Sequence, residues 1–416
     1  MLLMNDPVQT LKGFRDFTGT EARKRLWLIT QIRTVMERFG FEPLETPALE
    51  YESLLMGKYG EEADKLVYSF EDRGGRRVAL RYDQTVPTAR ILAQYCDLPL
   101  PYKRYQIQPV WRADKPQQGR YREFLQCDAD IIGSGSDVAD AEIITLYISI
   151  YNQIGLKSLQ VKVNDRSVLI QKLRESSVKE SQIASVIQSI DKLDKKPEQE
   201  VQTELLAKGI SDNTISNIFR LLNDKTEPES IALLRNLLQA YGIPNSQILY
   251  NPTLARGLDY YTGLIFEGVI PEYSVGSVGG GGRYDKLLNS LVGVDLPAVG
   301  FGLGFDRTLE AAEKLSLIPS FSSSANVLVT VFSPELIAES VKTATSIRSK
   351  GIPTTLYPEK NKGLDKQLKY ANRMMIPFVV IIGPEEIEKG VVKLKNMQTR
   401  EQIVDTEEKI ISIIIS

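Results

Sequence analysis

The feature that most constrains the fold of this chain is a series of short β-like segments between residues 78 and 133. Val78–Arg81, Tyr102–Val110 and Phe124–Ile132 alternate with turn-like sequence, and no helical period separates them. Consecutive strands without intervening helices favour an antiparallel sheet over the parallel sheet of a nucleotide-binding βαβ fold. We therefore expect an α+β fold whose main domain is built on an antiparallel sheet.

Helical sequence surrounds this sheet. Glu21–Phe39 carries apolar side chains at three- and four-residue steps, and Ala139–Ile154 is similar, so both are predicted to be helices. Residues 167–244 are rich in Lys, Glu, Ser and Gln, with Leu and Ile at helical spacing. We interpret them as a helical insertion, because sheet-like sequence with dense glycine returns from Ile248 to Gly304.

The remaining sequence indicates a second domain. The segment SLIPSFSSS at residues 316–324 has the composition of a linker, which we place at residues 319–325. Beyond it, strand-like and helix-like segments alternate through residues 326–416, which is typical of a small α/β domain. The main domain is then expected to consist of residues 1–166 and 245–318.

Composition excludes whole classes of chemistry. The 416 residues include no histidine, so serine–histidine triads, histidine bases and histidine-ligated metals are ruled out. The two cysteines, Cys96 and Cys127, are too few for a disulfide framework or a four-cysteine zinc site. Any chemistry must depend on arginines, carboxylates, amides, tyrosines and backbone groups, a set that suits charge stabilisation of phosphates.

Charge and hydropathy indicate the environment of the protein. The net charge is only −2, but six Lys and Arg stand against two Asp and Glu between Tyr102 and Gln126, so a local basic surface is expected. No signal-peptide pattern opens the sequence. The longest apolar run, Ile410–Ile415, is far shorter than the roughly 20 residues that a membrane span needs. We expect a cytoplasmic protein that does not associate with a membrane.

A polar loop joins two of the predicted strands. Arg112 ends one strand, Phe124 begins the next and Gln126 follows, so these three side chains are expected to project into one neighbourhood. An arginine fork can hold a phosphate through two hydrogen bonds, and an aromatic ring beside it can stack on a base. The alternative is an ordinary hairpin whose charges are solvated.

Two further motifs are rich in glycine. Ala298–Arg307 (AVGFGLGFDR) is predicted to be a strand that runs into a helix, with glycines that admit a ligand close to the backbone. Leu254–Gly263 (LARGLDYYTG) places paired tyrosines beside an arginine, and Gly279–Asp285 (GGGGRYD) follows. Taken singly, each motif is also compatible with a purely structural turn.

Together these motifs resemble the class II aminoacyl-tRNA synthetases. The Arg112 hairpin resembles motif 2 of that class, Gly302–Arg307 resembles motif 3, and Leu44–Glu50 (LETPALE) resembles the motif 1 dimer interface. Arg256–Gly263 (RGLDYYTG) is close to specific for the histidyl-tRNA synthetases, and Lys12–Asp16 (KGFRD) agrees with that family. The resemblance covers nearly the whole chain.

The resemblance implies a catalytic domain with an antiparallel sheet and a helical insertion, followed by an α/β anticodon-binding domain. It implies ATP-dependent activation of L-histidine to histidyl-adenylate and transfer to the 3′-terminal adenosine of tRNA(His). It also implies a homodimer that uses ATP together with Mg²⁺.

Residue roles follow from the resemblance by matched position. Arg256 and Arg112 are implied to be catalytic, on opposite sides of the α-phosphate. The implied histidine-binding residues are Asp83, Thr85, Gln126, Asp130, Tyr260 and Tyr261. The implied ATP-binding residues are Arg112, Asp114, Arg120, Phe124 and Arg307. No residue is assigned as a metal ligand.

A non-catalytic relative is the main alternative. The regulatory subunit of ATP phosphoribosyltransferase shares the catalytic-domain fold and binds histidine as a sensor. Such relatives usually lose the phosphate-binding arginines and the anticodon-binding domain. This chain keeps Arg112, Arg256 and Arg307, and residues 326–416 have the pattern of that domain, which favours the enzyme.

Overall fold

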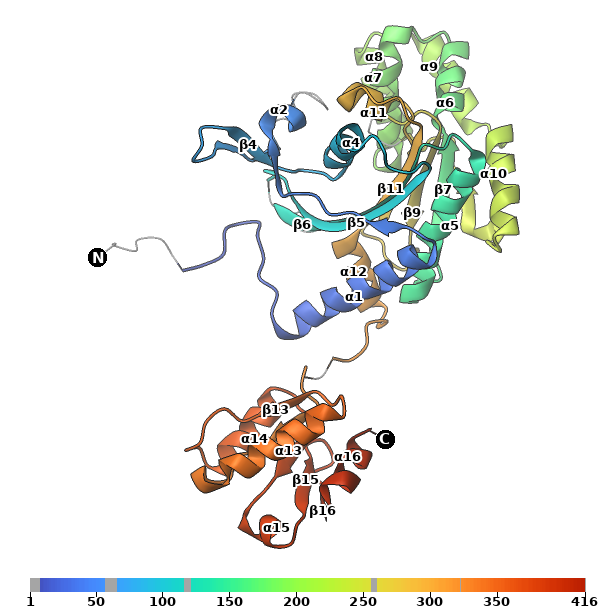
Figure 1. Ribbon diagram of the computed structural model, residues 1–416. Helices are drawn as coiled ribbons and strands as arrows, with labels where there is room; N and C mark the ends of the chain where they lie inside the picture. Colours follow the sequence, from blue (N-terminus) through green and yellow to red (C-terminus); the bar gives the residue numbers. More distant parts are fainter. Residues whose placement is uncertain (1–7, 57–65, 116–120, 256–259, 322, 416) are drawn as a thin grey trace. The chain divides into compact units, whose positions relative to one another are not determined.

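The computed structural model describes the chain apart from residues 1–7, 57–65, 116–120, 256–259, 322 and 416. The described residues form two compact units (Figure 1). The larger unit ends at Ile318 and the smaller begins at Pro319, with residues 17–24 grouped with the smaller. Within the described parts of the chain, no helix is long and apolar enough to cross a membrane.

A large sheet forms the centre of the larger unit. Its strands are β1 (Glu42–Pro43), β5 (Tyr102–Trp111), β6 (Glu123–Ile132), β7 (Gln160–Asp165), β8 (Ile248–Tyr250), β9 (Leu264–Val269), β10 (Gly279–Arg283) and β11 (Ala298–Gly304). They lie in the order β1-β5-β6-β11-β10-β9-β7-β8. Neighbours pair antiparallel except at the two edges, where β1 with β5 and β7 with β8 are parallel. The predicted antiparallel sheet is confirmed.

Helices cover both faces of this sheet (Figure 1). One face packs against α1 (Gly19–Arg38), α5 (Asp137–Ile154), α10 (Glu229–Ala240) and α12 (Phe305–Lys314). The other packs against α4 (Thr85–Gln94) and α11 (Leu287–Val292). Helix α5 begins where the Ser136 hydroxyl accepts a hydrogen bond from the Val138 amide, and it ends at Gly155 in the left-handed region. The two helices predicted from apolar spacing, α1 and α5, are confirmed.

Helix α4 corrects the expectation that turns alone separate the strands between residues 78 and 133. Val86, Ala89 and Leu92 follow a three-residue step and are buried in the core that α4 shares with α11. Pro87 is the third residue of the helix, where a backbone N–H has no partner within the helix and proline is tolerated. The apolar stripe is short and is interrupted by this proline, so the sequence pattern did not predict the helix.

The first predicted strand also lies elsewhere than expected. It forms β4 (Arg77–Leu80), which belongs to a separate antiparallel sheet of order β2-β4-β3, with β2 at Leu49–Tyr51 and β3 at Ser69–Glu71. A short helix, α2 (Glu52–Leu55), follows β2. The segment that resembles the class II dimer motif therefore leads into this small sheet.

The residues expected as a helical insertion, 167–244, divide between two cores. Helices α6 (Arg166–Glu175), α7 (Glu180–Ile190), α8 (Glu198–Ala207) and α9 (Asp212–Asn223), with the 3₁₀ turn η1 (Asp191–Asp194), share a core of their own. The leucines of α10 instead join the main core beside α5. A 3₁₀ turn, η2 (Asn245–Gln247), then leads into β8.

The smaller unit contains a five-stranded sheet of order β13-β12-β14-β15-β16. Strands β13 (Thr354–Leu356), β12 (Val327–Val329) and β14 (Phe378–Ile381) are parallel, and β15 (Val392–Asn396) and β16 (Gln402–Asp405) extend them antiparallel. The helical elements are η3 (Pro334–Leu336), α13 (Ile337–Ser349), α14 (Leu364–Arg373), α15 (Pro384–Glu388) and α16 (Glu407–Ile415). The alternation predicted here is confirmed, and the apolar run Ile410–Ile415 lies in α16, where Ile410 and Ile411 are buried.

Candidate active site

One face of β6 carries a row of polar residues. Gln126, Asp128 and Asp130 alternate along the strand and therefore point to the same side of the sheet. The residues that alternate with them point to the opposite side and pack into the main core: Cys127, Ala129 and Ile131. Two buried carboxyl groups on one strand cost desolvation free energy unless each of them is paired or hydrogen-bonded.

The neighbouring strand β11 forms a floor without side chains beside this row. In the register, Gly300 pairs with Asp130 and Gly302 with Asp128. A Cβ atom on Gly300 would overlap Asp130 Oδ1, and one on Gly302 would lie 3.2 Å from Asp128 Oδ1. Glycine at these positions therefore lets the carboxyl groups lie close to the strand and keeps the space above it open.

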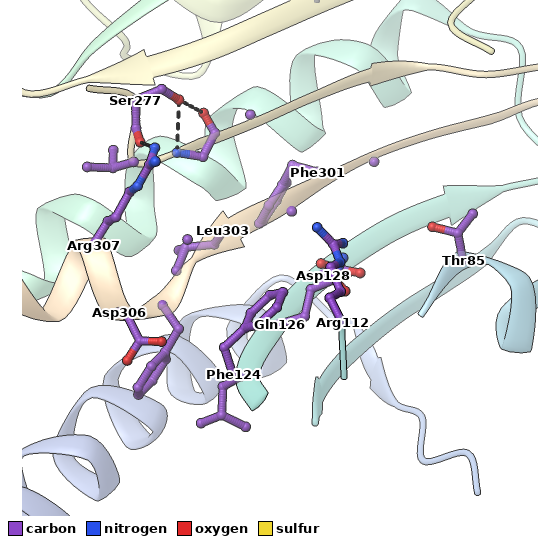
Figure 2. A pocket seen from close by; sticks show the side chains of 18 of the residues that line it. Thr85, Arg112, Phe124, Gln126, Asp128, Ser277, Phe301, Leu303, Asp306 and Arg307 are labelled. Carbon is purple, nitrogen blue, oxygen red and sulfur yellow. Dashed lines mark hydrogen bonds between the residues drawn. The ribbon is translucent and has the colours of Figure 1, made fainter. Parts of the chain in front are cut away.

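A cavity of about 690 Å³ opens over the floor. Figure 2 shows Arg112, Gln126 and Asp128 close together and Arg307 with Ser277 at some distance from them. The loop after β5, the start of β6 and the start of α12 all contribute to the lining. A cavity of this size, with convergent charged groups over an open floor, is the form of a ligand site.

Arg112 directly follows β5 and lines the cavity. Its Nε donates a hydrogen bond to the Tyr82 carbonyl at 2.9 Å, and its guanidinium carbon lies 5.2 Å from the centre of the Phe124 ring. No other acceptor among the described residues binds this guanidinium. The arginine and the ring thus lie together, as the hairpin pattern predicts, and the guanidinium is held at one nitrogen only.

Arg307, the third residue of α12, lines the cavity beyond the floor. Its Nη1 donates to the Ser277 carbonyl at 2.8 Å (Figure 2). The next carbonyl, that of Val278, accepts from the Tyr151 hydroxyl at 2.9 Å and from the Gly304 amide at 2.8 Å. The segment that positions Arg307 is therefore itself held from two sides.

Two further arginines, Arg15 and Arg25, connect the motifs near Arg307. Arg15 lies with its guanidinium carbon 3.2 Å from the centre of the Tyr121 ring and donates to Asp306 at 2.9 Å. Arg25 donates to the other oxygen of Asp306 at 3.1 Å. The segment Lys12–Asp16 thus contacts both the hairpin and the helix that carries Arg307.

The acidic end of the cavity surrounds one buried arginine. Arg104 forms an ion pair with Asp130, which also accepts a hydrogen bond from the Tyr284 hydroxyl. Burial raises the pKa of Asp130, and the charge of Arg104 opposes that rise. Burial raises the pKa of Asp128 to about 8, and the carboxyl groups of Asp130 and Asp83 add to the effect.

Aromatic rings form a wall near these acids. The rings of Tyr260 and Tyr261 lie with their centres 4.6 Å apart, and Tyr284 meets Tyr260 edge-on at 6.0 Å. All three line the cavity. A flat ring with polar edges would contact aromatic faces and carboxyl groups at once in this place.

The structure brings together most of the residues that the sequence indicates. Those that line the cavity are Thr85, Arg112, Asp114, Phe124, Gln126, Asp130, Tyr260, Tyr261 and Arg307. Asp83 is not among the lining residues; it is buried, and its Oδ1 accepts a hydrogen bond from the Val86 amide at 3.2 Å. Arg120 and Arg256 lie outside the described residues.

At the acidic end, three polar lining residues were not assigned a role from the sequence: Arg104, Asp128 and Tyr284. The two-residue period of β6 places Asp128 between Gln126 and Asp130, so the alternation was a usable signal. Arg104 is found only from the register, which sets it opposite Asp130. Tyr284 stands within the glycine-rich motif Gly279–Asp285, without a pattern that marks its side chain.

These features together define a class II aminoacyl-tRNA synthetase. They are the hairpin arginine, the glycine-rich strand that leads into a helix with a second arginine, and the separate α/β unit. The family model described as "Histidyl-tRNA synthetase" matches residues 13–308, and the model described as "Anticodon binding domain" matches residues 326–416. The chain belongs to the histidyl-tRNA synthetase family and is a histidine–tRNA ligase.

Relatives agree over nearly the full length. The histidine–tRNA ligase of Gloeobacter violaceus is 38% identical, with 94% of this chain and 95% of the relative covered. That of Cytophaga hutchinsonii is 37% identical, with 97% and 98% covered. The crystal structure of histidyl-tRNA synthetase from Nostoc sp. PCC 7120 matches with a TM-score of 0.85 at 29% identity, covering 99% of each chain.

A more distant structure shares the fold. The Bacillus halodurans protein described as an ATP phosphoribosyltransferase regulatory subunit/histidyl-tRNA synthetase matches with a TM-score of 0.74 at 23% identity, covering 87% of this chain and 96% of the other. At that identity the likeness concerns the fold alone.

Proposed function

We propose that the cavity over β11 holds histidine and ATP together, with the α-phosphate between Arg112 and the β6 residues. The observation that carries this proposal is the arrangement of Gln126, Asp128 and Asp130 beside a glycine floor, with Arg112 and Arg307 lining the same cavity. Acids at one end suit a cationic amino acid, and arginines suit a triphosphate.

Arg112 is proposed to bind the α-phosphate and Phe124 to stack on adenine. The guanidinium carbon lies 5.2 Å from the centre of the ring, which supports these two roles. When the α-phosphate binds the guanidinium, the face of the Phe124 ring remains available to stack on adenine. Arg307 is proposed to bind the distal phosphates, with Asp114 also on the ATP side of the cavity. Arg120 is assigned to ATP from the sequence resemblance alone.

Histidine is proposed to lie at the acidic end. Gln126 Oε1 is buried without a hydrogen-bond partner among the described residues, so it can accept a hydrogen bond from the substrate. Asp130 is proposed to bind an imidazole N–H, with the tyrosine rings beside it. The proposed histidine-binding residues are Asp83, Thr85, Gln126, Asp130, Tyr260 and Tyr261.

The chemistry consists of two transfers. A carboxylate oxygen of histidine attacks the α-phosphorus of ATP, forming histidyl-adenylate and releasing pyrophosphate. Arg112, with Arg256 assigned from the resemblance, stabilises the negative charge that builds on the phosphoryl oxygens. The terminal ribose hydroxyl of tRNA(His) then attacks the histidyl carbonyl and AMP leaves, with a phosphate oxygen proposed as the proton acceptor because the chain has no histidine.

Mg²⁺ is proposed to enter with ATP. The described residues contain no group of three or more acidic or cysteine side chains that could hold a metal ion by themselves. Mg²⁺ often keeps several waters and binds substrate phosphates with few protein ligands, which agrees with this cavity. When bound, the ion supplies further positive charge at the phosphates.

A homodimer in the cytoplasm is proposed on separate grounds. The small sheet β2-β4-β3 exposes Leu49 at 43%, Tyr51 at 61% and Phe70 at 43%. Apolar side chains gathered on one small sheet favour contact with a second copy, because their burial is favourable. Sedimentation of the full chain at micromolar concentration would test the dimer.

Histidine-dependent ATP–pyrophosphate exchange tests the proposed site as a whole. Exchange with histidine and with no other proteinogenic amino acid is expected, since only an imidazole satisfies the acids and the rings together. If a folded protein bound histidine without exchange, the sensor alternative would be favoured. A phosphoribosyltransferase partner would then be sought.

Asp130→Asn is expected to raise the KM for histidine about 100-fold in the exchange assay, because a charged hydrogen bond contributes about 1.5–3 kcal/mol. The KM for ATP should stay within about threefold of its starting value, because Asp130 lies at the opposite end of the substrate pair. Steady-state exchange at varied histidine and varied ATP measures both constants.

Asp140→Asn is the matched control for this variant. Asp140 is also a buried acid, paired with Arg283 as Asp130 is with Arg104, but it does not line the cavity. Asp130→Asn removes the ion pair of Arg104, and Asp140→Asn removes one of the two ion pairs of Arg283, so both variants should lower the melting temperature. Equal changes in the two KM values for Asp130→Asn, or the same histidine defect in Asp140→Asn, would contradict the assignment.

A further inference from the structure

Asp128 is buried among the cavity residues without a function in the proposed site so far. Its side chain is 5% exposed, and its Oδ1 has no hydrogen-bond partner among the described residues. Gly302 is its pairing partner on the neighbouring strand β11, and both residues line the cavity, so a ligand there can reach the carboxyl group. A buried carboxyl oxygen without a partner costs free energy unless something in the cavity binds it.

We propose that Asp128 is a specificity-determining residue that binds the imidazole nitrogen not bound by Asp130, so that the ring is recognised through one proton shared with a carboxyl group. This inference rests on the proposed place of histidine at the acidic end. It adds a second polar contact at the ring, on the opposite edge from the first. Only a ring that is basic at one nitrogen and carries a proton at the other satisfies both acids.

The spacing of the two acids fits an imidazole. Alternate residues of one strand lie about 7 Å apart and point the same way. An imidazole with a hydrogen bond of about 2.8 Å at each nitrogen spans a similar distance between its two acceptors. Asp128 and Asp130, on the same face of β6, can therefore bind the two edges of a single ring.

The charges around Asp128 favour a shared proton. From β5, Arg104 is the cation that faces it, and it is already paired with Asp130 on β6. Asp83 adds a further carboxyl group, whereas β11 contributes only glycine at this place. Asp128 and Asp130 both lie near this one buried guanidinium, and together with Asp83 they leave an excess of negative charge, which a proton or a cation relieves.

The remaining neighbours do not change this balance. Tyr284 faces Asp130, and burial raises the pKa of its hydroxyl well above the ordinary value, so it stays neutral. The Gln126 side chain lowers the pKa of Asp128 as a hydrogen-bond donor. Arg112 lines the same cavity, but the proposed site commits it to the α-phosphate.

The direction in which histidine binding changes with pH follows from the number of protons on Asp128 and on the ring before and after binding. The pKa of Asp128 is raised to about 8, so below that pH the empty enzyme carries the proton. Free imidazole has a pKa of about 6.5, so between these values a neutral ring meets a protonated acid and no proton is exchanged with solvent. Above pH 8 binding must take up a proton, and below about pH 6.5 it must release one.

The test compares the KM for histidine of the full-length enzyme and Asp128→Asn across pH 7 to 9.5 by pyrophosphate exchange. The amide can still donate one hydrogen bond but cannot exchange a proton. We expect the ratio of variant to native KM to be about 10 at pH 7 and to fall about tenfold per pH unit above pH 8. Titration of the substrate amino group affects both enzymes and cancels in the ratio.

A substrate analogue gives a second readout. In β-(1,2,4-triazol-3-yl)alanine the ring accepts a proton far less readily than imidazole. The native enzyme should prefer histidine over it, and Asp128→Asn should reduce that preference about tenfold. Asp128→Ala, which neither donates nor accepts, should weaken histidine binding at every pH, and its melting temperature shows whether it is folded.

The outcomes separate this inference from the proposed site. A constant KM ratio across pH, with unchanged preference over the triazole, would overturn the role of Asp128 while Asp130→Asn still raised the histidine KM. If neither Asp128→Asn nor Asp130→Asn changed the histidine KM, the place of the ring itself would be wrong. A falling ratio together with the lost preference supports the shared proton.

Discussion

Replacing Arg112 with alanine is expected to lower the rate of histidyl-adenylate formation by about 10³-fold or more. The guanidinium is held at Nε by the Tyr82 carbonyl, and the proposed site directs its other nitrogens to the α-phosphate. Removing one preorganised donor group from a developing anion costs about 10²–10³ in rate, and a bidentate cation contributes more. Single-turnover formation of the adenylate measures the chemical step directly.

Arg112→Lys distinguishes charge from geometry. Lysine keeps the charge but cannot form two parallel hydrogen bonds, so we expect an intermediate rate. Arg174→Ala is the matched control, because this arginine is 57% exposed and paired with Glu180 on the helical insertion. An Arg112→Ala enzyme that formed the adenylate within about tenfold of the native rate would remove Arg112 from the catalytic role.

Ending the chain after Ser324 is expected to leave amino-acid activation nearly intact and to lower tRNA charging by about 10³-fold. The larger unit ends at Ile318 and contains every described residue that lines the cavity. The removed residues, 325–416, include all those that match the anticodon-binding family, 326–416. Pyrophosphate exchange measures activation, and aminoacylation of tRNA(His) at varied tRNA concentration measures charging.

The control for truncation is the stability of the remaining unit. Its melting temperature and its histidine-dependent exchange should both resemble those of the full chain, within about threefold for exchange. Charging that persisted at the native kcat/KM would show that the acceptor end of the tRNA suffices for recognition. The proposed division of labour would then be wrong.

The sheet was predicted from local sequence pattern, whereas most of the residues that line the cavity were indicated by the resemblance to a known family. Arg112 and Phe124 lie close together because they stand at the two strand ends that the hairpin joins. Gln126 and Asp130 lie on one face of β6 because side chains alternate along a strand. The glycines of β11 are visible as spacing, and their function as a floor becomes clear only when the register sets them opposite the acids.

What the sequence could not show depends on pairing between distant segments. Helix α4 is short and carries a proline in its first turn, so its stability comes from burial against α11. The apolar period of its own sequence is too short to reveal it. Arg104 looks like one more basic residue until the register places it opposite Asp130. Helix α10 reads as part of the insertion, although its leucines complete the main core.

The glycine floor has a consequence for anyone who wishes to redesign amino-acid selectivity. A pocket is usually enlarged by trimming side chains, but Gly300 and Gly302 offer nothing to trim, and their strand backbone sets the depth of the cavity. Adding even a methyl group at Gly300 would overlap Asp130. Room for a new substrate must therefore be made at the aromatic wall and at the polar residues of β6. Side chains at these positions can be replaced by smaller or differently charged ones.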